Sequence, residues 1–241
     1  LMNSCYSYMF VDCSNLTEAP QLPATELKES CYQGMFQICT SLKVPPVLPA
    51  LKLAPNCYAM MFFGCSALEK TPELPATELT DQCYYGMFNE CVALTEMPDL
   101  PATHLAPSCY SYMFLGCKSL TKAKRLPATD LATMCYSGMF GVCTNLAEAP
   151  ELPAMDLAVA CYDHMFISCH ALTRAPELPA TTLRYRCYQN MFEDCVNLNY
   201  IKVGVMSLDN DSLATEDWVS RVDGEGLFIF PCGSKYNKHG D

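Results

Sequence analysis

Residues 83–108 read CYYGMFNECVALTEMPDLPATHLAPS, and this pattern fills most of the chain. The dipeptide Cys-Tyr begins at residues 5, 31, 57, 83, 109, 135, 161 and 187, so the period is 26 residues. Met-Phe follows four residues after each first cysteine, and a second cysteine follows after eight, which gives the unit CYxxMFxxCxxLxxxPxLPAxxLxxx. This ungapped repeat predicts a solenoid, because one unit cannot close a core alone and stacked units bury each column against itself.

The two halves of the unit predict different local structures. The CYxxMFxxC half places Tyr, Phe and the second Cys near helical spacing, which favours a short helical or 3₁₀ turn. The LxxxPxLPAxxL half is interrupted by proline, which excludes a long helix and favours short strands that pair in parallel between units. The expected fold class is therefore a solenoid of stacked 26-residue units, each with a short parallel strand and a short turn.

The unit resembles the BspA-like leucine-rich repeats of Bacteroidetes surface proteins. Residues 113–117 (MFLGC), followed by Leu120, resemble the turn and leucine-led strand of that family, and residues 74–76 (LPA) resemble its Ile-Pro segment. The resemblance covers residues 1 to about 200, although this unit is longer and carries cysteine where the common repeat tends to have glycine. It implies a leucine-rich-repeat-like solenoid on the surface of a Gram-negative gut-type bacterium, outer-membrane lipid anchoring, and adhesion or host interaction.

The period breaks near residue 201, which predicts a solenoid over residues 1–200 and a C-terminal cap over residues 201–241. Thr215 predicts the N-cap of a short helix through Val222, and residues 226–230 (GLFIF) predict a strand. Trp218, the only tryptophan, is expected to cover part of the last unit. The chain starts within a unit, so we expect a fragment of a longer protein, with any signal peptide or lipid anchor outside it.

Composition excludes several classes of protein. The 241 residues are 51% hydrophobic and 17% charged, which excludes global disorder. A net charge of -11 argues against nucleic-acid binding, which needs a basic surface. No apolar run approaches the ~20 residues that a transmembrane helix needs.

Sixteen of the 17 cysteines fall in the two repeated columns, and Cys232 lies outside them. If CYxxMFxxC is helical, its two cysteines lie ~12 Å apart, beyond the ~7 Å limit between bridged Cα atoms. A bridge between stacked units fits poorly too, because parallel side chains leave Cβ atoms near ~4.8 Å rather than ~3.8 Å. We therefore expect buried thiols that pack as small apolar side chains.

No metal, cofactor or catalytic site is predicted. Cysteines eight residues apart, and four histidines in different columns, do not match the close ligand pairs of zinc sites. Residues 209–211 begin like a calcium loop, but Leu213 and Ala214 replace the expected ligand and glycine, so a turn is expected there. The chain has no GxSxG, phosphate-binding glycine loop or HExxH motif, and Cys232 has no histidine near it except His239, so we do not expect an enzyme.

Two variable columns mark a candidate interaction face. The first alternates in charge from Lys70 onward, and the second is mostly acidic, with a basic island in the fifth unit. Charges in adjacent units can neutralise one another, or the basic island can contact an anionic group. The residues that we assign to this face are Glu73, Asp99, Arg125, Glu151, Glu177, Lys122 and Lys124.

These features predict a noncatalytic surface protein that binds a protein partner through the solenoid face. The alternative is a glycan-binding accessory lipoprotein beside an outer-membrane nutrient transporter. It depends on the column of eight tyrosines from Tyr6 to Tyr188, which would have to form an exposed strip that stacks on sugar rings, and it is supported by further tyrosines at Tyr8, Tyr85, Tyr112 and Tyr185. The competing interpretation of that column has the rings packed between units, with their hydroxyls reaching water. A spacer role within a larger surface protein is the third alternative.

Overall fold

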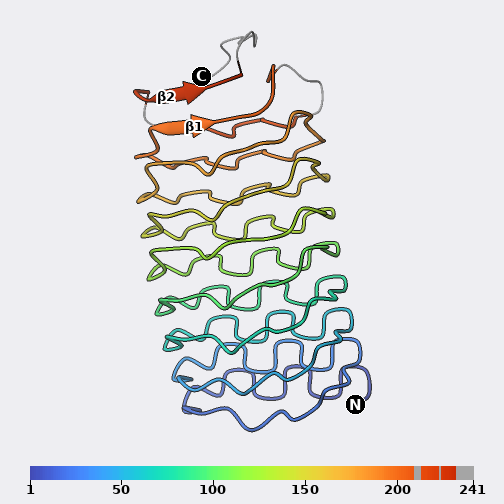
Figure 1. The fold of residues 1–241 in the computed structure, drawn as a ribbon. Coiled ribbons are helices and arrows are strands. Elements are labelled where there is room, and N and C mark those ends of the chain that lie inside the picture. Colours follow the sequence, from blue (N-terminus) through green and yellow to red (C-terminus); the bar gives the residue numbers. More distant parts are fainter. Residues whose placement is uncertain (209–212, 223, 232–241) are drawn as a thin grey trace.

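The computed structural model describes residues 1–208, 213–222 and 224–231. The chain winds into a stack of similar coils, with the N-terminus at one end and the two strands at the other (Figure 1). We call each coil a rung and number the rungs from the Cys-Tyr dipeptide that begins them, so that rung 1 starts at Cys5 and rung 8 at Cys187. The predicted solenoid of 26-residue units is therefore present in the structure.

Each rung begins with a turn segment, the CYxxMFxxC stretch, whose backbone hydrogen bonds alternate in direction. In rung 1 the amides of Tyr6, Tyr8 and Phe10 donate to carbonyls 25 residues later in rung 2, over 2.8–3.0 Å. The amides between them, such as those of Met9 and Val11, donate to carbonyls three residues earlier in the same rung. Half of the amides thus tighten the segment, and the other half join it to the next rung.

The predicted helical or 3₁₀ turn is wrong for these segments, because the described residues contain no helix. Every fourth residue has a positive φ, as at Tyr8 (56°) and Asp12 (58°) in rung 1 and Gly34 (57°) in rung 2. A left-handed residue reverses the backbone and ends the helical run of i→i−4 bonds. The four-residue spacing of Tyr and Phe mimics a helix, but it comes from this repeating turn.

The second half of each rung, which we call the proline segment, forms less strand than expected. Adjacent rungs are joined here by no more than isolated parallel bridges, such as Glu18 to Val44 and Lys122 to Glu148. Proline at two fixed columns removes the amides that a longer ladder needs. In rung 8 Lys202 replaces the first of those prolines, and there strand β1 (Tyr200–Lys202) pairs in parallel with β2 (Leu227–Ile229).

The core consists of the repeated columns, as predicted. The cysteine, methionine and phenylalanine columns and the first leucine column (Leu68 to Leu198) of rungs 3 to 8 are at most 1% exposed. Phenylalanine rings of adjacent rungs stack with their centroids 5.6–5.8 Å apart and nearly parallel. The core side chains of each rung are therefore buried by the same residues of the adjacent rungs, and these contacts recur along the stack.

The predicted helix from Thr215 to Val222 is also absent, and another turn segment takes its place. Leu213, Asp217 and Arg221 have positive φ at the same four-residue spacing as in the rungs. The amide of Phe192 donates to the carbonyl of Trp218, so this segment continues the ladder with one extra residue. Trp218 is 6% exposed and lies against Tyr188 and Phe192, as the capping prediction requires. The domain boundary near residue 200 stays a prediction.

Candidate functional site

The proline segments of successive rungs form one continuous surface, which we call the proline face. It carries the two variable columns that begin with Glu18 and Gln21 in rung 1. Parallel bridges hold the first column in register at three of its steps, because Glu18 pairs with Val44, Lys122 with Glu148 and Arg174 with Tyr200. The seven candidate residues therefore share a surface, although they are spread from residue 73 to residue 177.

Two grooves lie on this face. The larger, of about 590 Å³, lies between rungs 6 and 7, and its lining includes Glu151 and Glu177. The smaller, of about 410 Å³, lies between rungs 3 and 4, and its lining includes Glu73, Asp99 and Lys124. Both have proline, leucine and small side chains among their lining residues, together with charged side chains. Grooves with apolar surface and a few charged groups suit the binding of a chain segment.

Ion pairs between rungs neutralise the C-terminal part of the face. Lys122 Nζ lies 2.5 Å from Glu148 Oε2, and Arg125 Nε lies 3.5 Å from Glu151 Oε2. Lys124 pairs with Asp99, and Lys202 pairs with Glu177, at 3.1 and 3.0 Å. These side chains are 44–87% exposed, so each pair contributes about 0–1 kcal/mol to stability.

Most basic side chains of the rung 5 island are thus paired with carboxylates of the neighbouring rungs. The pairs of Lys122, Lys124 and Arg125 follow the self-neutralisation that the sequence predicts. Arg174 takes part differently, because its guanidinium carbon lies 3.5 Å from the centre of the Tyr200 ring. A cation over an aromatic face at this distance is held by the ring's quadrupole.

Val44 and Val47 of rung 2 stand in the same two columns and were not among the residues assigned to the face. Their side chains are 50% and 68% exposed, respectively. The corresponding residues of rungs 1 and 3 to 7 are all charged or, at Gln21, an amide. The sequence does contain a sign of this apolar surface, because valine interrupts two columns that are otherwise polar. A prediction based on charged residues alone does not include it.

The tyrosine column does not form an exposed strip for sugars, so that interpretation is wrong. From Tyr32 to Tyr188 the side chains are 1–2% exposed. Their rings stack from rung to rung with centroids 5.8–6.0 Å apart, as the competing interpretation expects. The hydroxyls do not all reach water, because the oxygen of Tyr110 is buried and has no hydrogen-bond partner among the described residues.

The cysteines of rungs 2 to 8 are buried, and none of the 16 that the structure describes is in a disulfide. The second cysteine of each of these rungs also donates its Sγ–H to the phenylalanine carbonyl of the rung before. Cys117 Sγ lies 3.2 Å from the Phe88 oxygen, and Cys143 Sγ lies 3.1 Å from the Phe114 oxygen. Burial raises the pKa of Cys143 to about 12, so the thiol stays protonated and unreactive at neutral pH.

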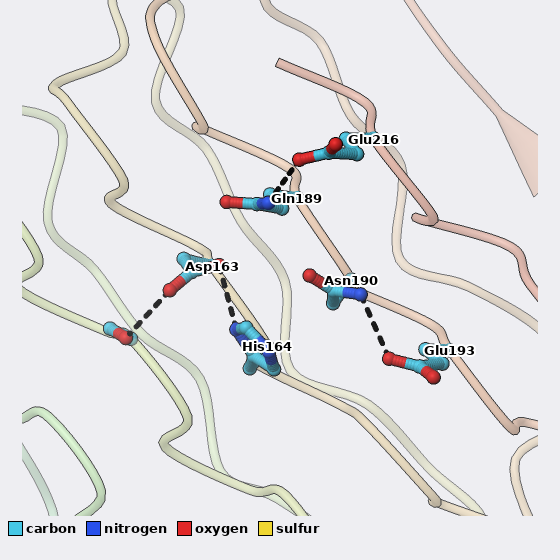
Figure 2. Close-up of polar contacts among 7 residues, drawn as sticks. Asp163, His164, Gln189, Asn190, Glu193 and Glu216 are labelled. Carbon is cyan, nitrogen blue, oxygen red and sulfur yellow. Dashed lines mark hydrogen bonds and ion pairs between the residues drawn. The ribbon is translucent and has the colours of Figure 1, made fainter. Parts of the chain in front are cut away.

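A polar cluster lies on the turn segments of rungs 6 to 8 and the segment after them (Figure 2). His164 Nδ1 lies 2.7 Å from Asp163 Oδ1, and this hydrogen bond is the main cause that raises the pKa of His164. Ser137 Oγ contacts the other oxygen of Asp163 at 3.5 Å. The Ser137 hydroxyl thus contacts the Asp163 carboxylate and not the His164 imidazole. In a catalytic triad the serine hydroxyl donates its hydrogen bond to the imidazole.

The structure gives no support for a metal site or a membrane-spanning helix among the described residues. Among the described residues, no three His, Cys, Asp or Glu side chains are grouped so that they could hold a metal ion. Nor does this part of the chain contain a helix that is long and apolar enough to cross a bilayer. The calcium-loop pattern at 209–211, Cys232 and His239 lie outside the described residues.

Comparison with known proteins gives a weak likeness to one solved structure. No protein-family model and no curated protein matches the chain. A solved structure with a similar course is that of a leucine-rich repeat protein from Bacteroides ovatus, at 14% sequence identity and a TM-score of 0.29. The match covers 93% of this chain and 86% of that one.

Proposed function

We propose that the chain is a noncatalytic recognition solenoid of the leucine-rich-repeat type that binds another protein along its proline face. The observation that carries the proposal is the pair of grooves on this face, each with apolar and charged lining side chains. The repeated cysteine, tyrosine and phenylalanine columns are buried and hold the rungs together. These columns therefore stabilise the fold and cannot contact a partner, whereas the columns that differ between rungs are exposed.

The chemistry of the described residues supports binding rather than catalysis. The buried thiols are held protonated, since burial raises the pKa of Cys65 and Cys195 to about 12. The glycan alternative loses its main support, because the rings from Tyr32 to Tyr188 cannot contact a sugar from inside the stack. Adhesion or host interaction at the bacterial cell surface, through an outer-membrane anchor, is the setting that the sequence resemblance suggests.

Site-specific photocrosslinking tests the proposal. Benzoylphenylalanine replaces Glu73 in the smaller groove or Glu151 in the larger groove, and in a matched variant it replaces Tyr185, which is 46% exposed and lines neither groove. In the cells that produce the protein, we expect discrete adducts that yield partner peptides on digestion, from position 73, position 151 or both, at least tenfold more abundant than from position 185. Adducts from position 185 that equal those from both groove positions would contradict a face-specific protein partner. Adducts that yield no partner peptides and lose their added mass on periodate treatment would show a glycan instead.

A further inference from the structure

The charged side chains in the two variable columns of the proline face all have partners from rung 5 onward, whereas in rungs 1 to 4 only one of the five, Asp99, is paired among the described residues. From rung 5 onward each of them has a partner, through the four ion pairs of the face or the Arg174–Tyr200 contact. In rungs 1 to 4 the side chains of Glu18, Lys70, Glu73 and Glu96 have no ion pair or hydrogen bond with any described residue. Unpaired charges are free to contact a partner without first breaking an internal contact.

Rung 2 adds an apolar surface to the same half of the face. Val44 and Val47 flank two prolines, of which Pro45 is half-buried, and Leu51 is 61% exposed further along the rung. A single exposed aliphatic side chain is ordinary, but neighbouring ones on a polar face are typical of a contact surface. An apolar centre with a polar rim is the usual composition of a protein interface.

The rim is predominantly acidic. Three of its four unpaired charges are carboxylates, those of Glu18, Glu73 and Glu96, and the whole chain carries a net charge of -11. Glu73 and Glu96 also line the groove between rungs 3 and 4, together with Lys70 and with the Asp99–Lys124 pair, so two carboxylates and one ammonium are unpaired there. Charge complementarity therefore favours a basic group in this groove.

We propose that rungs 1 to 4 of the proline face bind an extended segment of a partner protein. An aliphatic or aromatic residue of that segment lies on Val44 and Val47, and a lysine or arginine lies in the groove beside Glu73 and Glu96. This deepens the proposed function and rests on it. The rungs are ~5 Å apart and an extended chain advances ~3.3 Å per residue, so the basic residue follows the apolar one by about two or three positions.

A second copy of the chain fits this surface less well. A two-fold contact between two copies would set the valines of rung 2 against each other, but it would also bring the acidic rims together. Like charges across an interface oppose association. A basic segment of a different protein satisfies both the apolar centre and the rim.

Selection from a random 12-residue peptide library displayed on phage, with the full chain as bait, tests the proposal. We expect enriched peptides to share an apolar residue with a lysine or arginine two or three positions away. Val47→Glu should weaken their binding at least tenfold, and so should Glu73→Lys. The matched control Glu177→Lys, a charge reversal in the C-terminal groove, should change it less than twofold.

The outcomes separate this inference from the proposed function. Enriched peptides that are acidic, or that lose binding with Glu177→Lys but not with Val47→Glu, would overturn the inference and leave the proline face as a protein-binding surface. Absence of enriched peptides together with absence of face-specific crosslinks would overturn both. Concentration-dependent dimers in sedimentation that Val47→Glu abolishes would assign the patch to a second copy and overturn the inference.

Discussion

At the scale of single residues, the buried cysteine is the most informative side chain of the molecule. Cys117 fills a site that is 0% exposed and donates its thiol hydrogen to the Phe88 carbonyl in the rung before. That carbonyl also accepts the backbone amide of Cys91, so the thiol adds a second bond to one oxygen. Cysteine therefore serves both as a small apolar side chain and as a weak donor between rungs.

These thiols make the fold sensitive to alkaline pH. Burial raises the pKa of Cys65, Cys135 and Cys195 from 9.0 to about 12. Above pH 9 the unfolded chain loses thiol protons that the folded chain retains, so the free energy of unfolding falls as pH rises toward 12. Each such thiol contributes a loss of roughly 1.4 kcal/mol per pH unit in this range.

We therefore expect urea-induced unfolding to show constant stability from pH 7 to pH 8 and a steep decline between pH 9 and pH 11. The thiolate absorbance at 240 nm of the buried cysteines of rungs 2 to 8, recorded in parallel, should rise only as the chain unfolds. Thiolate formation near pH 9 in the folded protein, with its stability unchanged, would show that the cysteine columns are open to water.

At the scale of the element, the turn segment shows how adjacent rungs fit together on the outside of the stack. A left-handed residue recurs every fourth position, and in one column bulky residues alternate with glycine from Tyr8 to Gly138. A Cβ atom on Gly138 would lie 2.4 Å from two atoms of the Tyr112 ring, and one on Gly34 would lie 2.3 Å from the Tyr8 ring. The bulky side chain of one rung thus covers the glycine of the next.

This fit predicts the effect of Gly138→Ala. The substitution adds a methyl group at φ 61° and against the Tyr112 ring, so we expect a loss of about 2–4 kcal/mol in urea unfolding. Adding Tyr112→Ala should recover the steric part and leave about 1 kcal/mol from the left-handed backbone. Gly224→Ala, where a Cβ would meet nothing within 4 Å, is the matched control and should change stability by less than about 0.5 kcal/mol. No recovery in the double variant would refute the contact.

The sequence predicted the columns of the fold better than the backbone between them. The 26-residue period was enough to place Cys, Tyr, Phe and Leu inside, because identical units can bury a residue only against its own copies. It could not distinguish a helix from a repeating left-handed turn, since both return a side chain to the same side after about four residues. The alternating glycines at residues 34, 86 and 138 were the available sign of that turn.

Strand length was overestimated for a local reason. The proline column predicts a short strand that ends near the proline, yet only isolated bridges form between adjacent rungs in this part of the unit. Where Lys202 takes the place of proline, the three-residue strand β1 forms. At Lys124, the other exception, the amide instead donates to Met97 Sδ over 3.1 Å. Loss of the proline is therefore not sufficient for a strand, because rung 5 is bridged to rung 6 at Lys122 and Glu148 and still forms none.

At the scale of the whole molecule, the stack converts a repeated unit into a surface with distinct halves. In the charged variable columns, the side chains of the C-terminal half are paired, and those of the N-terminal half are unpaired except for Asp99. The sequence could place these residues on one face, because equal positions of successive units align. The pairing itself depends on side-chain geometry, and so do the grooves, which is why the prediction named Arg125 and Lys122 but not Val44 and Val47.

Carboxyl footprinting tests the central claim most directly, that the N-terminal half of the proline face is where a partner binds. The full chain is labelled with a carbodiimide and glycine ethyl ester, alone and with a display-selected peptide, and the modified residues are located by mass spectrometry. We predict that the peptide lowers labelling of Glu73 and Glu96 at least fivefold while labelling of Glu151 and Glu177 stays within 20% of its value in the free protein. Protection of Glu151 and Glu177 alone, or no protection on this face, would contradict the claim.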